Sequence, residues 1–176
     1  MQIIWSLPVK ISTYANDRNS VMFPVIEKCP ICGTGAKLVR HGFYSRYALF
    51  RNRSYRLDIC RYLCRSCLKT ISLLPWFLLP YFQHTRNTIL MTLRNWLSGR
   101  PAFVCRQLVA FYRQRFYQNI PAIITALRET GWLDSLPEND KEKAIKVVDR
   151  LMITITTPSR YSNRVLTNFM ASSFYH

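Results

Sequence analysis

Acidic side chains are scarce in this sequence. Only 9 of the 176 residues are Asp or Glu, against 25 Lys and Arg, so the formal net charge is +16. Nucleases and strand-transfer enzymes need two or three carboxylates on one scaffold to hold paired metal ions, and no predicted strand offers such a set. The sequence also lacks a glycine-rich phosphate loop, a His-Glu-x-x-His motif and a nucleophile elbow. We therefore expect no catalytic activity.

The chain also lacks a long apolar segment. Its most apolar run, residues 71–82, contains Pro75 and Pro80, whereas a membrane-spanning helix needs about 20 uninterrupted apolar residues. The first residues show neither a basic region nor a small-residue cleavage site, so no secretory signal is evident. We expect a cytoplasmic protein with reduced cysteines, and reduced cysteines favour metal binding over disulfides.

Glycine is rare as well, and five glycines are too few for a low-complexity chain. Hydrophobic residues make up 49% of the sequence, which is enough to form a core. The pattern predicts three segments: a leader over residues 1–27 with extended pieces at 2–7 and 21–26, a β module with a proline-interrupted connector over 28–82, and a helical domain over 83–176.

The helical domain is predicted from the helical spacing of its apolar residues and from residues that begin and end helices. Apolar residues share one helix face over residues 86–98, and Gly99 ends that helix. A second helix is expected from Pro101 to about Tyr117, and Pro121 should start a new helix or kink this one. The capping box Ser135-Leu-Pro-Glu138 predicts a helix through about Met152. A further short helix is expected after Pro158, giving a bundle of four or five helices.

The strongest motif is a pair of Cys-x-x-Cys turns, Cys29-Pro-Ile-Cys32-Gly33 and Cys64-Arg-Ser-Cys67. Two intervening residues let both thiolates converge on one ion, so two such turns supply the four ligands of a closed tetrahedral zinc site. Strand-like sequence over 37–49 and 54–63, with a turn at residues 51–53, fills the space between them. This layout predicts an α+β fold in which a four-cysteine zinc ribbon with one structural Zn²⁺ precedes an α-helical bundle.

Other candidate ligands are weaker. Cys60 lies four residues before Cys64 and would share its face in a strand, but we interpret it as a core residue. Cys105 is also expected in the core. His41 suits a surface or phosphate-contacting role better than a ligand role, and His84 is interpreted as a linker residue.

Positive charge is concentrated in residues 28–86, which hold eleven Lys and Arg against one acid, Asp58. Aromatic residues interleave with arginines along the predicted hairpin, a pattern that suits base stacking combined with phosphate contact. Two alternative roles stay open: the aromatics cover a small core, and part of the charge offsets the negative zinc–tetrathiolate. The arginine-bearing helix over 101–117 is a second basic surface. The candidate hairpin contacts are Arg40, Arg46, Arg51, Arg53, Arg56 and Arg61.

Three stretches carry a family resemblance: Cys29-Pro-Ile-Cys-Gly, Arg40-His-Gly-Phe-Tyr-Ser-Arg and Cys60-Arg-Tyr-Leu-Cys-Arg-Ser-Cys-Leu-Lys-Thr. They resemble the N-terminal zinc ribbons of insertion-sequence transposases and their small accessory proteins. With residues 74–81, the sequence is similar to an uncharacterised bacterial zinc-ribbon family associated with mobile elements. Over about residues 24–98, the resemblance implies zinc at Cys29, Cys32, Cys64 and Cys67 and a role in recognising transposon DNA. A helix-turn-helix often follows such ribbons, and residues 101–131 are the place for one.

The sequence therefore favours a non-catalytic zinc-ribbon DNA-binding protein that is an accessory or a fragment of a transposition or recombination system, with duplex DNA rather than a membrane as its partner. One alternative is an adaptor to a separate transposase or recombinase, for which the apolar connector with Trp76 and Phe77 is the docking strip. A second alternative is an RNA-binding zinc ribbon.

Overall fold

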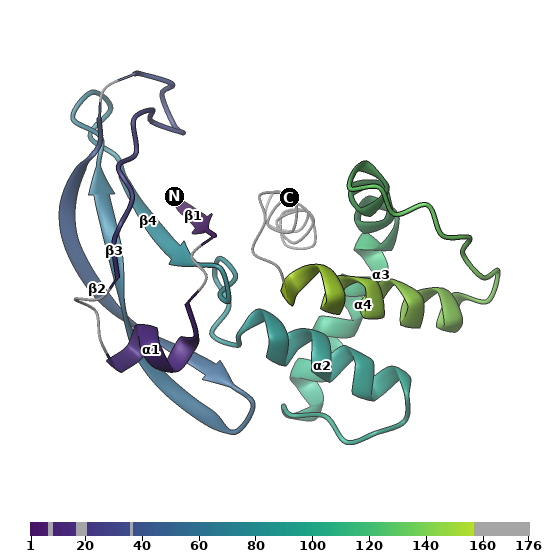
Figure 1. Ribbon diagram of the computed structural model, residues 1–176. Helices are drawn as coiled ribbons and strands as arrows, with labels where there is room; N and C mark the ends of the chain where they lie inside the picture. Colours follow the sequence, from purple (N-terminus) through teal and green to yellow (C-terminus); the bar gives the residue numbers. More distant parts are fainter. Residues whose placement is uncertain (7–8, 17–20, 36, 157–176) are drawn as a thin grey trace.

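A computed structural model shows the fold and describes residues 1–6, 9–16, 21–35 and 37–156, apart from the side chains of residues 154–156. Within these ranges the elements follow in the order β1–α1–β2–β3–β4–α2–α3–α4. The four strands form one sheet on one side of the molecule, and α2, α3 and α4 lie on the other side (Figure 1). The predicted α+β class is confirmed.

One long hairpin forms most of the sheet. β2 (Val39–Phe50) and β3 (Arg53–Leu63) pair antiparallel, and the turn between them lies at Arg51 and Asn52, where the sequence predicts it. β4 (Thr70–Pro75) is antiparallel to β3, and β1 (Gln2–Trp5) pairs parallel with β4. The strand order is therefore β1-β4-β3-β2.

The segment before the first cysteine is part of this sheet. Besides β1, it forms the short helix α1 (Ile11–Asn16), whose buried Tyr14 donates a hydrogen bond of 3.0 Å to the Asp58 carbonyl on β3. Residues 21–26, expected to be extended, form no strand. The leader thus closes one sheet edge and covers part of one face.

The two faces of the sheet belong to different cores. Leu57 and Ile59 of β3 pack in a cluster with Tyr14 of α1, and both are fully buried. Cys60 and Tyr62 point to the opposite face and pack in a second cluster that includes Cys29 and Cys64. The alternation of these side chains between the two faces follows from the two-residue period of a strand. Cys64 directly follows β3, at the end of the sheet remote from the turn.

The remaining helices share a third core. These are α2 (Arg86–Leu97), α3 (Arg106–Glu129) and α4 (Asp140–Thr156). Thr85 caps α2, because its side chain accepts a hydrogen bond from the Thr88 amide. Leu90 and Leu93 of α2 are buried in one cluster with residues of α3 and α4. The predicted helix over 86–98 and its end at Gly99, where φ is +70°, are confirmed.

Three helix predictions need correction. α3 begins at Arg106 rather than at Pro101, and it runs past Pro121 without a break. A proline inside a helix costs about 3 kcal/mol, but the buried neighbours Ile120 and Ile123 anchor this part of α3 in the core. α4 begins at Asp140 and not near Ser135, because the side chain of Asn139 caps it by accepting from two amides. The short helix predicted after Pro158 lies outside the described residues.

Most of the connector after β4 is buried, although Tyr81 near its end is 72% exposed. Leu78 and Leu79 are 0% and 1% exposed; Leu78 packs in a sheet core and Leu79 in the helix core. The connector is therefore the joint between sheet and helices, and Trp76 and Phe77 form no exposed docking strip. None of the described helices combines the length and the apolar character that crossing a bilayer requires.

Candidate metal centre and basic hairpin

Two loops at one end of the sheet have the same backbone plan. In the first knuckle (residues 29–34) the Cys29 amide donates to the Thr34 carbonyl at 3.0 Å, and in the second (residues 64–69) the Cys64 amide donates to the Lys69 carbonyl at 3.1 Å. The residue after the second cysteine has a positive φ in both, +74° at Gly33 and +56° at Leu68. The two loops are thus equivalent in backbone geometry although their sequences differ.

The knuckles bring four sulfur atoms together. The Sγ atoms of Cys29 and Cys67 are 3.9 Å apart and those of Cys32 and Cys64 are 3.8 Å apart. All four sulfurs lie within 4.8 Å of one another. A tetrahedral metal with metal–sulfur bonds of about 2.3 Å would place its ligands about 3.8 Å apart. The four cysteines could therefore hold one metal ion, and an all-sulfur tetrahedral set is typical of zinc or iron.

Each sulfur also accepts a hydrogen bond from the amide two residues further along. The Ile31 amide reaches Cys29 Sγ at 3.4 Å, and equivalent amides serve the other three sulfurs. The hydroxyl of Thr34 also contacts Cys32 Sγ at 3.2 Å. The side-chain and backbone hydrogen bonds from Thr34 lower the pKa of Cys32 to about 6. Amides aimed at sulfur stabilise the thiolate, which is the form that binds metal.

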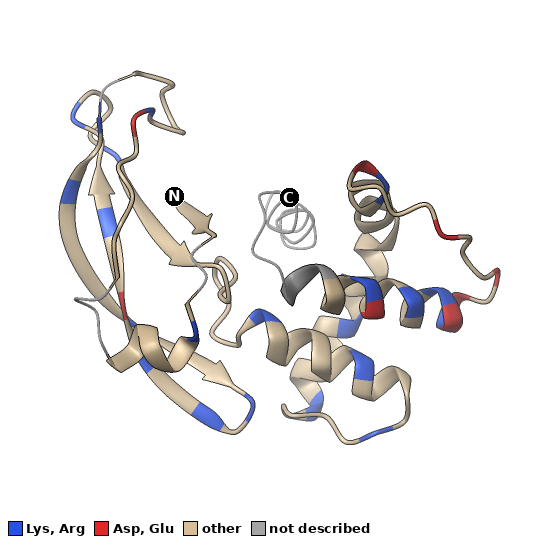
Figure 2. Cartoon of the chain, in the orientation of Figure 1, with Lys and Arg blue, Asp and Glu red and all other residues tan. Residues whose placement is uncertain are grey.

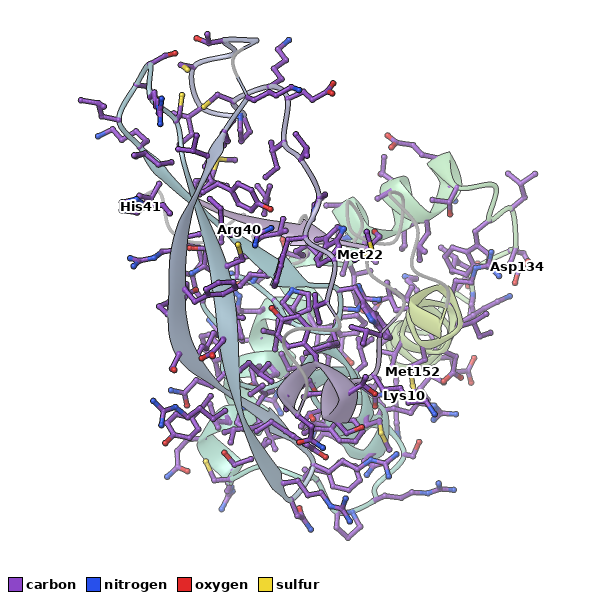
Figure 3. All side chains as sticks on the ribbon, turned by 60° about the vertical axis from the view of Figure 1, so that its left-hand side comes forward. Lys10, Met22, Arg40, His41, Asp134 and Met152 are labelled. Carbon is purple, nitrogen blue, oxygen red and sulfur yellow. The ribbon has the colours of Figure 1, made fainter. Side chains whose placement is uncertain are left out.

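The other candidate ligands lie outside this cluster. Cys60 is fully buried in the core beside it, and burial raises the pKa of its thiol. His41 is exposed, and it and Arg40 point to opposite sides of β2 (Figure 3). Cys105 is exposed at the start of α3, not buried as expected. His84 Nδ1 and the Tyr112 hydroxyl share a hydrogen bond of 2.9 Å, and burial lowers the pKa of the His84 imidazole.

The predicted hairpin arginines fall into two groups. Three lie away from the turn and have structural partners: the Arg46 guanidinium donates to the carbonyls of Leu79 and Phe82 in the connector, Arg40 lies over the Phe23 ring, and Arg61 lies over the Tyr44 ring. Arg51, at the turn, also has such partners, because its guanidinium lies 5.4 Å from the centre of the Phe50 ring and donates to Met91 Sδ at 3.4 Å. Burial lowers the pKa of Arg46. The geometry thus gives Arg46 a structural role in place of the phosphate contact predicted for it.

The second group lies at the turn end of the hairpin. Arg51, Arg53 and Arg56 are all exposed, and no carboxylate pairs with any of them among the described residues. Arg56 is the cross-strand partner of Tyr47, whose side chain is 57% exposed. Basic residues follow the hairpin to its turn, whereas acidic residues gather mainly on and before α4 (Figure 2). This end of the hairpin therefore presents positive charge beside an exposed aromatic ring.

Sequence patterns did not separate buried arginines from exposed ones. Arg86 at the start of α2 is 1% exposed, and burial lowers its pKa to about 9. Arg115 of α3 is 5% exposed and lies over the rings of Phe82 and Phe111. For Arg115, its place on the apolar face of α3 beside Phe116 was the only sequence signal of burial.

Comparison with known proteins adds one match. Residues 29–102 match the model of a family described as a domain of unknown function, DUF6431. The matched range begins at the first cysteine of the cluster and runs through the hairpin, β4, the connector and α2. No curated protein and no solved structure matches the chain significantly. The chain is thus similar to this family over the segment that holds all four clustered cysteines.

Proposed function

We propose that this protein is a non-catalytic, zinc-dependent DNA-binding protein in which a zinc ribbon precedes a helical bundle. The observation that carries the proposal is the exposed trio Arg51, Arg53 and Arg56 at the turn end of a long hairpin. At its other end the same hairpin is joined to the four-cysteine cluster. A two-stranded ribbon of this kind fits the major groove of duplex DNA, where arginines neutralise phosphates.

Zinc would be held by Cys29, Cys32, Cys64 and Cys67. Four protein ligands complete a tetrahedral zinc site and leave no open position, so the ion would contribute folding energy and no chemistry. The second knuckle directly follows β3 and directly precedes β4. Fixing it to the first knuckle would therefore hold the sheet together at the end opposite the turn.

The DNA of a mobile element is the target that the sequence resemblance favours. Among the described residues no group of three or more acidic side chains lies close enough together to hold a metal ion, so the role proposed is that of an accessory protein or of a fragment of a transposition or recombination system. The adaptor alternative loses its main feature, because most of the apolar connector is buried. An RNA-binding ribbon is tested in the same experiment.

The test is fluorescence anisotropy of the zinc-loaded full chain with a 20-base-pair duplex, a single strand and an RNA hairpin over a salt series. Duplex should bind most tightly. Replacing the trio as Arg51→Gln/Arg53→Gln/Arg56→Gln should make the negative slope of log K against log salt less steep by about 2.7, because three phosphate contacts are removed.

The matched control is Lys37→Gln/Arg128→Gln/Lys141→Gln, which removes the same charge from exposed sites away from the turn. Its slope should change much less. Equal slopes in the two triple variants would contradict the hairpin assignment, and a preference for RNA over duplex would replace DNA with RNA as the partner.

A further inference from the structure

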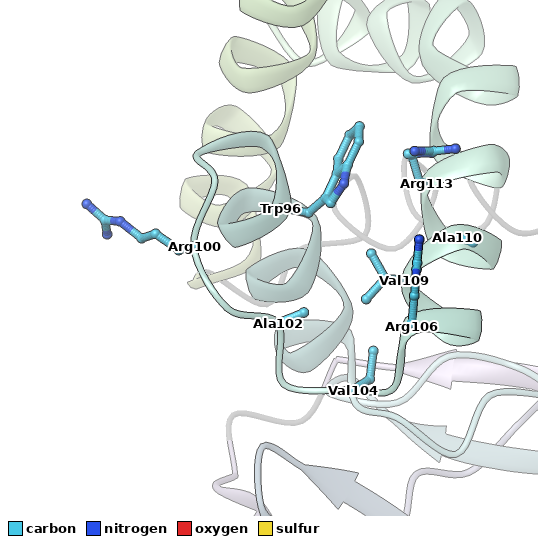
Figure 4. A pocket seen from close by; sticks show the side chains of 8 residues that line it. All are labelled: Trp96, Arg100, Ala102, Val104, Arg106, Val109, Ala110 and Arg113. Atoms are coloured by element: carbon cyan, nitrogen blue, oxygen red, sulfur yellow. The ribbon is translucent and has the colours of Figure 1, made fainter.

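A second basic site lies outside the hairpin, in a cavity between α2 and α3. The cavity has a volume of about 570 Å³ and is open to solvent on one side. Figure 4 shows Arg106 and Arg113 on one wall and Trp96 facing them, while the Arg100 side chain points away. Small apolar side chains complete the lining: Ala102, Val104, Val109 and Ala110.

The charge of this cavity is not neutralised. Its lining includes no carboxylate, and no salt bridge to Arg106 or Arg113 occurs in the part of the chain that the structure describes. The two arginines are seven residues apart on α3, which places them on the same face two turns apart. Two guanidinium groups that share one wall suit an anion, and phosphate is one of the anions that arginine binds through paired hydrogen bonds.

One of the two arginines, Arg113, is held in place before any ligand binds. The Arg113 guanidinium lies 5.0 Å from the centre of the Trp96 ring, and Trp96 in turn packs edge-on against Tyr117. The loop below is fixed by the Asn95 side chain, which donates to the Pro101 carbonyl at 2.9 Å. A cation–π contact of this kind restricts the guanidinium, so less conformational entropy is lost on binding.

The cavity also adjoins the turn of the hairpin. The Arg51 guanidinium lies 6.0 Å from the Phe103 ring, and Phe103 is between Ala102 and Val104 of the cavity lining. The Arg51 amide donates to the Thr88 hydroxyl of α2 at 2.9 Å, which fixes the turn to the helices. Arg51 of the hairpin trio therefore lies next to the loop that forms part of the cavity lining.

We propose that Arg106 and Arg113 bind a backbone phosphate of the DNA that the hairpin contacts, with Trp96 as the apolar wall beside the sugar. This inference rests on the proposed function and adds a second contact point to it. The phosphodiester backbone is favoured over a free phosphate compound because the cavity is open to solvent and adjoins the loop that Arg51 of the hairpin contacts.

The test compares Arg106→Gln/Arg113→Gln with the control Arg128→Gln/Lys141→Gln, which removes the same charge from exposed sites at the other end of α3 and on α4. The cavity variant should bind the 20-base-pair duplex at least tenfold more weakly. Its negative slope of log K against log salt should be less steep by about 1.8. Duplex should also quench tryptophan fluorescence in the unchanged protein and less in Trp96→Phe. Inorganic phosphate should compete only at millimolar concentration.

Three results would overturn the inference. The first is a cavity variant that binds duplex like its control while the hairpin trio variant loses affinity, which leaves the proposed function standing. The second is duplex binding that leaves Trp96 fluorescence unchanged. The third is tight binding of inorganic phosphate that duplex does not displace, which would assign the cavity to a free phosphate compound. If neither variant lost duplex affinity, both this inference and the hairpin assignment would be rejected, whereas failure of the unchanged protein to bind any nucleic acid would reject the proposed function itself.

Discussion

The two knuckles show how one backbone plan is reached from two sequences. In both, the amide of the first residue donates a hydrogen bond to the carbonyl of the sixth, and the residue after the second cysteine has a positive φ. Gly33 adopts that conformation without steric cost, whereas the branched Leu68 does so against a penalty of about 1–2 kcal/mol. Leu68 is 74% exposed, so packing does not compensate for it. The geometry of the sulfurs and the closing bonds therefore dominates over local preference at the second knuckle.

Removing a cysteine from either knuckle should have the largest effect. Cys29→Ser and Cys64→Ser should each abolish stoichiometric zinc binding and unfold the metal end of the sheet, because three thiolates leave the tetrahedron incomplete. Metal content after dialysis and far-ultraviolet circular dichroism measure this. Cys105→Ser, which removes an exposed thiol, should retain one zinc per chain. A folded, zinc-replete Cys29→Ser protein would refute the ligand assignment.

Exchanging the residues at positive φ should have opposite effects in the two knuckles. Gly33→Leu should destabilise the zinc-bound protein by about 1 kcal/mol, since nothing lies within 4 Å of an added Cβ and the cost is conformational. Leu68→Gly should stabilise it by about 0.5–1 kcal/mol, because relief of strain exceeds the added chain entropy. Thermal and urea unfolding of the zinc-bound proteins measure both changes.

Gly35→Ala is the control for these exchanges, because it also adds a Cβ into open space but at a φ outside the left-handed region. It should change stability by less than about 0.5 kcal/mol. If Leu68→Gly proved destabilising, the positive φ at Leu68 would not be a strained conformation.

The smallest effect concerns the hydroxyl of Thr34 in the first knuckle, because the second knuckle has Lys69 at the equivalent position. Thr34→Val removes the contact with Cys32 Sγ, so the pKa of Cys32 should rise toward its ordinary value. Protons then compete with metal more effectively, and zinc affinity should fall several-fold at pH 6 but little at pH 8. A competitive zinc chelator at the two pH values measures this. Thr13→Val on α1, an exposed threonine away from the cysteines, should leave both values unchanged.

Local signals predicted much of the fold. The paired cysteines, the turn at Arg51 and the helix ending before Gly99 each depend on residues close together in sequence. The pairing of β1 with β4 could not be predicted in this way, because Gln2 and its partner Ser72 are far apart in the chain and four residues carry little periodic signal. The start of α4 was missed because Asn139 caps that helix in place of the more conspicuous Ser135.

In the candidate site, too, the features that depend on neighbouring residues were predictable, and those that depend on the tertiary fold were not. Cysteine spacing identifies ligands because two thiolates of one turn must converge. Arginine spacing does not reveal which guanidinium groups reach solvent, since long side chains pair with carbonyls or rings according to the tertiary fold. Arg46, Arg86 and Arg115 all count as positive charge in the sequence, but the structure places each of them partly or wholly inside the protein.

The bonds of Arg46 to the connector have a mechanical consequence. They join the middle of the hairpin to the joint between sheet and helices, while the Leu49 amide donates to the Gln83 carbonyl and the Thr85 amide donates to the Leu49 carbonyl nearby. With so many attachments, the hairpin cannot swing relative to the helices without breaking several of them together. The protein would then act on a flexible polymer as a fixed template, selecting strands already shaped to its surface or bending them to it.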